Sequence, residues 1–198
     1  ELLESIAGLQ ETVGDSSIEY IEPETEKKSQ LIGKTALQIK NMGVALSFVP
    51  EDRLGMGLVG TMGMSDNMML RSFRRGRSPF VDRKTPRKLA KKTVERLGVV
   101  TAGLSTPVRR LSGGNVQKIL VGREIASAPT VLLTAYAVRG LDINSSYTIY
   151  DLVNQQKKNG VAVVFVGEDL DVLLQLCDRI MVLCGGQVSG ILDARTTN

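Results

Sequence analysis

Histidine is absent from the 198 residues of this chain. That absence excludes histidine-based catalytic triads, histidine general bases and histidine metal ligands. Cysteine is scarce: Cys177 and Cys184 are the whole complement, and their spacing matches neither a zinc site nor a disulfide framework. We expect both to be reduced thiols in the apolar core of a cytosolic protein.

Long hydrophobic runs are also missing, because no apolar stretch approaches the roughly 18 residues that a membrane span needs. The chain opens at Glu1 with an acidic, amphipathic stretch in place of a basic segment followed by an apolar one, which predicts no signal peptide. The composition, 42% hydrophobic and 23% charged, is that of a soluble globular protein. The length is sufficient for one domain with a core of its own.

The last third of the chain alternates between strand and helix signals. Short apolar runs typical of buried strands are followed by segments with helical spacing of apolar residues. The expected strands are 131–133, 161–166 and 180–183, and the expected helices carry Ile149, Leu152 and Val153 on one and Leu170, Leu173, Leu174 and Cys177 on the other. Gly185-Gly186 predicts a short hairpin into residues 187–192. This alternation predicts an α/β domain with a parallel sheet.

The remaining two thirds divide into an N-terminal part and a basic, mostly helical middle. The N-terminal part is expected to hold a helix at residues 2–9, strands at 17–21 and 44–49, and a hairpin turn at 32–34. The middle, about Thr61 to Arg110, is interpreted as a helical insertion. Within it, Thr85 is the expected N-cap before Pro86, and Gly98 is the expected stop.

Basic residues concentrate in this middle part. Between Arg71 and Arg96 there are 11 lysines and arginines and 2 acidic residues, so the stretch alone carries a charge of about +9. The net charge of the whole chain is +4, so the rest of the chain is acidic. Phe73 and Phe80 flank its run of arginines at 74, 75 and 77. We favour a solvated or membrane-facing surface over a nucleic-acid site, and we expect no nucleic-acid partner.

One short stretch, Leu111-Ser112-Gly113-Gly114-Asn115, combines the features of a phosphate site. It places a hydroxyl and two glycines before a helix expected at residues 116–127. Glycines let the backbone approach a ligand closely, and the free N–H groups at a helix start favour an anion. Taken alone, the same stretch also suits a plain loop and helix cap, so the neighbouring residues decide between the two interpretations.

The stretch and its neighbours resemble the motifs of ABC ATPases. Leu-Ser-Gly-Gly-Asn-x-Gln-Lys is similar to the signature motif of the sugar-transporter branch, and Arg139-Gly140-Leu141-Asp142 follows a buried strand like the family's D-loop. Glu168 lies where the family has its switch residue, and Glu51, in Pro50-Glu51-Asp52-Arg53, lies where other members have the Q-loop glutamine. The resemblance covers residues 1–194. It implies an α/β, P-loop NTPase-like core at 1–60 and 111–198 with a helical subdomain at 61–110.

The resemblance also implies a function. In this family two nucleotide-binding domains hold ATP and Mg²⁺ between them, and each signature motif completes the site of the other domain. Leu111, Ser112, Gly113, Gly114, Asn115, Glu51, Asp142 and Glu168 are then the nucleotide-facing residues, with Asp142 expected to contact the partner domain. The implied partners are a second nucleotide-binding domain and membrane permease subunits of a sugar or nucleoside importer. The implied location is the cytoplasmic face of the membrane.

The chain departs from the family pattern at its own nucleotide site. A Walker A loop ending in Gly-Lys-Ser or Gly-Lys-Thr is missing, so we expect the chain to begin just after it and part of the core to be exposed. Gly33-Lys34-Thr35 is no substitute, because Lys28 stands where the loop's first glycine belongs. The Walker B aspartate aligns with Ala135, its glutamate with Tyr136 and the switch histidine with Glu168. We therefore expect no catalytic residue and no metal ligand in this chain.

Some interpretations stay open at this point. Glu51 either senses the nucleotide or belongs to a surface cluster with Asp52 and Arg53. The methionines at 56, 62, 64, 68 and 69 either form a docking surface for a membrane subunit or fill the core. The whole domain either contributes half of a catalytic site or acts as a non-catalytic scaffold that couples its partner to the membrane subunits. A soluble ABC-type protein acting on nucleic acid is a third class.

Overall fold

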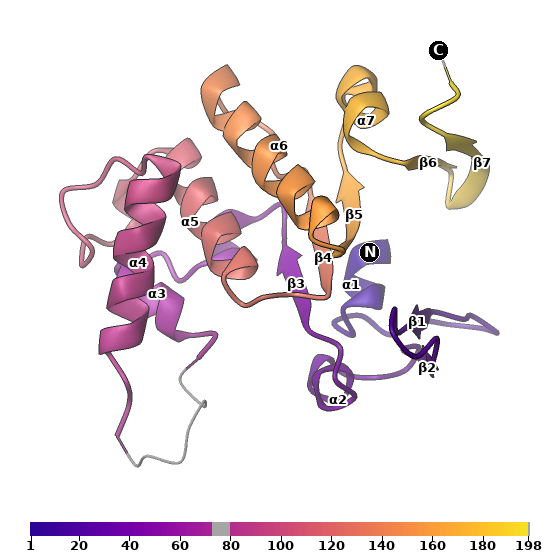
Figure 1. The fold of residues 1–198 in the computed structure, drawn as a ribbon, viewed down its shortest axis with the longest axis horizontal. Coiled ribbons are helices and arrows are strands. Elements are labelled where there is room, and N and C mark those ends of the chain that lie inside the picture. Colours follow the sequence, from indigo (N-terminus) through magenta and orange to yellow (C-terminus); the bar gives the residue numbers. More distant parts are fainter. Residues whose placement is uncertain (73–79, 198) are drawn as a thin grey trace.

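The centre of the fold is a three-stranded parallel sheet with the strand order β3–β4–β5 (Figure 1). The computed structural model describes residues 1–72 and 80–197. Two antiparallel pairs, β1–β2 and β6–β7, lie outside this sheet. The strands are β1 (Glu19–Ile21), β2 (Lys28–Gln30), β3 (Leu46–Val49), β4 (Val131–Ala135), β5 (Ala162–Val166), β6 (Arg179–Cys184) and β7 (Gln187–Asp193).

Helices cover both faces of the parallel sheet. The helices are α1 (Leu2–Ile6), α2 (Ala36–Asn41), α3 (Met64–Met69), α4 (Lys84–Leu97), α5 (Gly113–Ile125), α6 (Ile143–Lys158) and α7 (Leu170–Leu176), with a π-helical turn η1 (Arg53–Gly57) and a 3-10 turn η2 (Val108–Arg110). Alternate side chains of the strands point to opposite faces. Leu132 packs into the core under α5 and α6, whereas Leu133 packs into a second core with α1 and α2. The α/β class expected from the alternation is thereby confirmed.

The middle of the chain forms a separate helical layer beyond α5 (Figure 1). Met64, Met68 and Ala90 are buried there against α5, so two of the clustered methionines fill the core. Met56 and Met62 are exposed, which leaves them free to contribute to a surface. The arginines at 74, 75 and 77 and Phe73 lie outside the described residues.

Two helix starts differ from the sequence expectation. Helix α4 begins at Lys84 and not after Thr85, because the Asp82 carboxylate accepts hydrogen bonds from the backbone N–H groups of Lys84 and Thr85. The Thr85 side chain first, and then these backbone bonds, hold the pKa of Asp82 below its usual range. Gly98 ends the helix in the left-handed region, as expected. Helix α5 begins at Gly113, three residues earlier than expected, so both glycines lie in its first turn.

Two strand expectations were wrong in topology. Residues 32–34 form a turn after β2 and not a hairpin, because β1 and β2 are joined through residues 22–27. Thr35 caps α2 through Gln38, so the Gly33-Lys34-Thr35 sequence is a helix start there. Strand β6 does not join the parallel sheet, since it pairs with β7 across Gly185-Gly186. This hairpin is the one predicted from the glycine pair.

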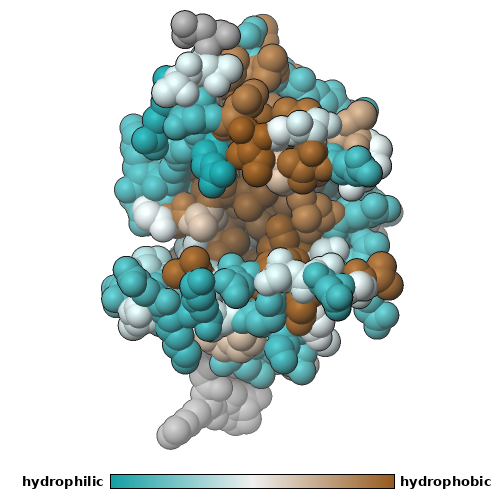
Figure 2. All heavy atoms as spheres, turned by 90° about the vertical axis from the view of Figure 1, so that its right-hand side faces the viewer, coloured by the Kyte–Doolittle hydropathy of each residue, from teal (hydrophilic) through white to brown (hydrophobic). Residues whose placement is uncertain are grey.

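A large apolar surface is exposed on the side that carries β1–β2 and β6–β7, where Figure 2 shows apolar side chains gathered in a hollow. Val164 of β5 and Leu183, Val188 and Ile191 of the β6–β7 hairpin are between 37% and 54% exposed. An exposed part of the core is what the sequence predicted. Cys184 also lies here and is exposed, which corrects its expected core position, whereas Cys177 is half-buried. Both thiols are free.

Candidate nucleotide-facing site

Ser112 holds the loop that leads into α5. The residue has an extended backbone, and its hydroxyl oxygen accepts hydrogen bonds from the Asn115 backbone at 3.4 Å and the Asn115 side chain at 2.9 Å. The side-chain oxygen of Asn115 accepts a further bond, at 2.9 Å, from the backbone N–H of Val100. Leu111 is half-buried and packs against the main core. The loop is therefore tied to its surroundings on both sides.

The same loop keeps unused hydrogen-bond donors at its surface. The first N–H groups of a helix have no partner within the helix, and in α5 these belong to Gly113 and Gly114. Within residues 1–72 and 80–197, neither group donates to another residue, and the Ser112 hydroxyl acts only as an acceptor. Ser112 and Gly113 are exposed. These donors and the helix dipole make the start of α5 suited to an anion.

Both glycines have close neighbours. A methyl group on Gly114 would lie 2.9 Å from Ser145 Oγ and 3.4 Å from Asp142 Oδ2, at the start of α6. A methyl group on Gly113 would lie 3.1 Å from Nη1 of Arg53, the flexible end of a side chain. The signature loop, residues 111–115, thus packs against the start of α6 and against Arg53 of η1. A side chain at position 114 would push the loop away from α6, whereas one at position 113 would displace only the end of Arg53.

Asp142 is the N-cap of α6. Its Oδ1 accepts a hydrogen bond of 2.9 Å from the Ser145 backbone N–H. Hydrogen bonds from the side chain and the backbone of Ser145 hold the pKa of Asp142 below its usual range. The carboxylate therefore has a role inside its own chain, next to the signature loop, and its expected contact with a partner domain stays a prediction.

Glu51 and Glu168 meet at the carboxyl edge of the parallel sheet. Glu51 follows β3, Arg139 follows β4 and Glu168 follows β5, and the carboxyl ends of parallel strands share one edge. Arg139 Nη1 lies 2.6 Å from Glu51 Oε1, and Arg139 Nε lies 3.5 Å from Glu168 Oε1. One guanidinium therefore joins both predicted acidic residues. Glu51 is not in a cluster with Asp52, whose carboxylate caps η1.

Tyr136 and Ala135 occupy the same edge at the end of β4. Tyr136 has a positive φ of 49°, and its N–H donates to the Val166 carbonyl at 2.9 Å. The Arg139 guanidinium carbon lies 5.6 Å from the centre of the Tyr136 ring, within the range of a cation–π contact. A bulky residue with positive φ is uncommon, and such residues gather at functional sites.

Arg53 connects the two groups of residues. Its Nη2 donates to the Arg139 carbonyl, while Nη1 lies beside Gly113. Partial burial lowers the pKa of Arg53. Arg53 and Arg139 thus link the carboxyl edge to the loop before α5. Both lie in stretches that resemble family motifs, but the sequence assigned neither a role, and their pairing across 86 positions has no short-range signal.

The carboxyl edge does not fit Mg²⁺. Ala135 offers no ligand atom, and the oxygens of Glu51 and Glu168 already face a guanidinium. Among the described residues there is no group of three or more acidic, cysteine or histidine side chains that could hold a metal ion. The start of α5 offers hydrogen-bond donors alone, so it suits a phosphate and not its metal. The expectation that the chain lacks a metal ligand set of its own stays a prediction.

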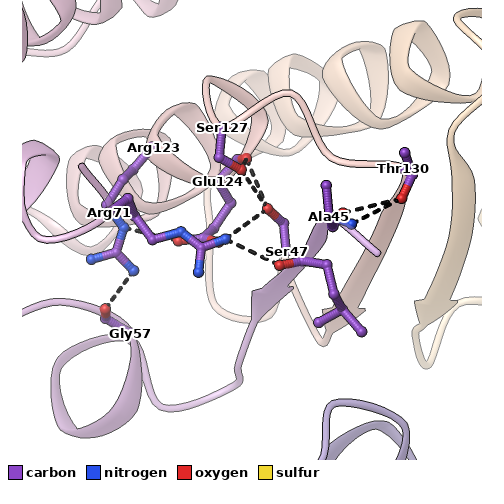
Figure 3. Close-up of polar contacts among 9 residues, drawn as sticks. Ala45, Ser47, Gly57, Arg71, Arg123, Glu124, Ser127 and Thr130 are labelled. Atoms are coloured by element: carbon purple, nitrogen blue, oxygen red, sulfur yellow. Dashed lines mark hydrogen bonds and ion pairs between the residues drawn. The ribbon is translucent and has the colours of Figure 1, made fainter. Parts of the chain in front are cut away.

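A groove of about 550 Å³ is lined by residues of α2, β3, η1 and α5 and by the turn that follows α3. Leu37, Met56 and Leu70 are exposed along it. Figure 3 shows the polar side chains at its floor, where the buried Glu124 of α5 is flanked by Arg71 and Arg123. Arg71, part of the basic stretch, is therefore an internal partner of the core and not a purely solvated cation.

No protein-family model matches the chain. The ribose import ATP-binding protein RbsA of Rhodopirellula baltica is 34% identical over 194 residues, which is 98% of this chain and 36% of that protein. The xylose import ATP-binding protein XylG of Moorella thermoacetica is 36% identical over 78% of this chain and 31% of that protein. The chain thus spans about a third of the length of these relatives.

Solved structures match at the level of the fold. A dimeric bacterial ABC transporter cassette superimposes with a TM-score of 0.76 over 99% of this chain and 80% of that one, at 21% identity. A dimeric ATP-binding cassette in a post-hydrolysis state with ADP and phosphate gives a TM-score of 0.75 at 22% identity. The sequence relatives and the shared fold agree with the signature motif. The chain belongs to the family of ABC ATP-binding proteins, and its relatives there include the ATP-binding proteins of sugar importers.

Proposed function

We propose that the chain is the second, C-terminal nucleotide-binding domain of an ABC importer for a sugar or nucleoside, with residues 61–110 as its helical subdomain. Its signature loop, Leu111 to Asn115, completes an ATP site whose phosphate-binding loop and Mg²⁺ ligands belong to the partner domain. Its own site is degenerate. The sugar-import names of the relatives support the transport class.

The observation that carries this proposal is the set of hydrogen-bond donors at the start of α5 that are unpaired within the described residues. Ser112, Gly113 and Gly114 present a hydroxyl and two backbone N–H groups to solvent, with nothing in the described part of the chain to receive them. A γ-phosphate held by a partner domain would accept hydrogen bonds from these donors. The positive end of the dipole of a 13-residue helix would stabilise it further. Preorganised donors of this kind stabilise charge that develops on a transferring phosphoryl group.

The degenerate state of the chain's own site follows from the carboxyl edge. Ala135 cannot bind a metal, and Tyr136 offers a phenol where a carboxylate would polarise water. Glu168 is engaged by Arg139. No catalytic step is therefore assigned to this edge, and ATP and Mg²⁺ are proposed as ligands shared with the partner domain.

The groove beside η1 is the proposed docking surface for a membrane permease subunit. Its exposed Leu37, Met56 and Leu70 offer apolar area, and methionine side chains adapt to different partners. The groove lies between the helical layer and the parallel sheet, so an attached subunit would contact both and move with them. Among the described residues no helix is long and apolar enough to cross a membrane. We therefore propose peripheral attachment at the cytoplasmic face.

Replacement of Ser112 by arginine in the complete transporter tests the half-site. The larger side chain would fill the space that the γ-phosphate needs and would remove the hydroxyl. We expect ATPase activity to fall at least a hundredfold, as for the loss of a preorganised donor, while assembly with the permease is retained. Ser105→Arg, in the loop before η2, is the matched control. ATPase activity within threefold of wild type in the Ser112 variant would contradict the proposal.

The alternative function is that of a non-catalytic scaffold. One observation favours it: at the carboxyl edge, Glu51 and Glu168 both form ion pairs with Arg139. A scaffold would couple the partner domain to the permease without touching ATP. The Ser112 variant separates the two functions. If the domain is a scaffold, the complete transporter keeps its ATPase activity in that variant. It then loses transport only when the docking groove is altered, for example by Leu37→Asp.

A further inference from the structure

We propose that Arg139 is a positioning residue that stands in for a metal ion at the carboxyl edge of the sheet and, through Arg53, holds the signature loop in place. This inference rests on the proposed half-site. It assigns a role to a disagreement, namely that the family implies Mg²⁺ at this edge and the residues present do not fit it.

The first step of the argument is that one cation joins three loops. The guanidinium of Arg139 contacts Glu51 after β3 at 2.6 Å and Glu168 after β5 at 3.5 Å, and Arg139 itself follows β4. A divalent ion at such an edge would draw carboxylates from neighbouring strands together. The guanidinium does the same with a single positive charge and with directed hydrogen bonds. The three loops are therefore held without a metal.

The second step is that the backbone of the same residue reaches the signature loop. The Arg139 carbonyl accepts a hydrogen bond from Arg53 Nη2, and Arg53 Nη1 lies where a Cβ of Gly113 would be within 3.1 Å. Arg53 has no carboxylate partner within ion-pair distance among residues 1–72 and 80–197. Its position thus depends on the Arg139 carbonyl, and its other terminal nitrogen packs against Gly113 by close contact, with no hydrogen bond between them in the described part of the chain.

The third step is the local backbone at the end of β4. Tyr136 keeps a positive φ of 49° while its carbonyl accepts the Arg139 N–H at 3.1 Å and its ring lies near the guanidinium. A residue in this conformation persists only when its surroundings hold it. The contacts of Arg139 with Glu51, Glu168 and Tyr136 supply that hold. Loss of the guanidinium would release the turn that carries the carbonyl to which Arg53 binds.

The side chains of Arg139, Glu51 and Glu168 are 57%, 51% and 62% exposed, so their ion pairs are accessible to salt. Exposed pairs are weak, and a Debye length of about 3 Å at 1 M salt screens them. The positioning effect should therefore be modest and salt-dependent. A role in packing alone would persist at high salt.

The test uses Arg139→Ala, Arg139→Lys and the control Arg179→Ala in the complete ATP-binding protein with its permease. Arg179 is an exposed arginine of β6. At low salt we expect Arg139→Ala to lower the kcat for ATP about two- to fivefold, the range of exposed ion pairs. We expect KM to stay constant, because the phosphate-binding loop belongs to the partner. Arg139→Lys should lose less, Arg179→Ala nothing, and the difference from wild type should disappear at 1 M salt.

Hydrogen exchange of the same variants, followed by mass spectrometry without nucleotide, gives a readout independent of activity. In Arg139→Ala the hydrogen-bonded amides at positions 115, 116, 136 and 139 should exchange faster, and those of β6–β7 should not change. Equal exchange and equal kcat in the Arg139 and Arg179 alanine variants would overturn the inference, as would a loss of kcat unchanged at 1 M salt. If the Arg139 prediction fails while Ser112→Arg abolishes ATPase activity in the same assay, only the role of Arg139 is overturned. If Ser112→Arg keeps its ATPase activity, the proposed half-site is overturned.

Discussion

Two clusters of arginine and glutamate lie in this domain, and they differ in burial more than in chemistry. At the floor of the groove, the side chains of Glu124 and Arg123 are 2% and 8% exposed. At the carboxyl edge, all three charged side chains are more than half exposed. The contrast shows that the same ion pair holds a fold together where water is excluded and only orients loops where water is present.

The buried cluster makes more polar contacts than the exposed one, although among the described residues Glu124 Oε2 accepts no hydrogen bond and has only the ion pair with Arg71. Glu124 Oε1 accepts a bond of 2.9 Å from Arg123 Nε, and Arg123 Nη2 donates to the Gly57 carbonyl at 2.7 Å. Arg71 Nη2 lies 3.0 Å from Glu124 Oε2 as an ion pair and donates to the Leu46 carbonyl and to Ser47 Oγ, as Figure 3 shows. This cluster joins α3, α5, β3 and η1 around the groove.

Replacement of Glu124 by alanine should have the largest effect on stability. It leaves the buried Arg123 without its carboxylate, and an uncompensated buried charge costs about 3–5 kcal/mol of the free energy of unfolding. Urea denaturation followed by circular dichroism measures this loss. Glu95→Ala, which breaks an exposed pair with Lys91 on α4, is the control and should change little. Equal losses in the two variants would remove the comparison.

Neutralising the exposed cluster should have a smaller effect. The double substitution Glu51→Gln and Glu168→Gln removes both partners of Arg139. We expect the free energy of unfolding to change by less than about 1 kcal/mol, and this change to vanish at 1 M salt. Urea denaturation at two salt concentrations is the measurement. A loss as large as that of the Glu124 variant would show that the edge is part of the structural core.

Asp142 should give the smallest change, one visible only in acid. A carboxyl with a lowered pKa adds stability above its ordinary pKa and loses it as pH falls through the lowered value. Because asparagine caps helices as well as aspartate, Asp142→Asn should match wild type at pH 7. As the pH falls below about 4, the ordinary pKa of an aspartate, the melting temperature of wild type should fall more steeply than that of the variant. Parallel curves would show that the Ser145 bonds do not favour the ionised form.

The elements that the sequence predicted well are those with local causes. The glycine at position 98 ends α4, the glycine pair at 185–186 turns β6 into β7, and the apolar runs of β4 and β5 became parallel strands. Only β4 is buried, whereas β5, expected to be buried as well, is partly exposed. The signature loop was found from five adjacent residues. The misplaced helix starts are also local errors, because Asp82 lies only two residues before Lys84 and its capping bonds could have been anticipated.

The residues that the sequence could not assign are those whose partners are distant along the chain. Glu51 and Arg139 are 88 positions apart, and Arg71 reaches Ser47 over 24. The D-loop-like stretch contains Arg139, but the sequence does not say which side chains it contacts. Its partners are set by the register of β3, β4 and β5, which brings three loops to one edge.

The class of fold could be read from the amino-acid sequence, which also predicts an anion site at the start of α5 and a lack of metal ligands at Ala135 and Tyr136, because helix starts, apolar runs and side-chain chemistry depend on neighbouring residues. Which charges meet depends on the three-dimensional packing. Arg139 was assigned to Glu51 and Glu168, Arg53 to Gly113 and Arg71 to Glu124 by the parallel pairing of strands and the packing of α3 on α5. Ion pairs act over a few ångströms in space, and separation along the chain carries no information about that distance.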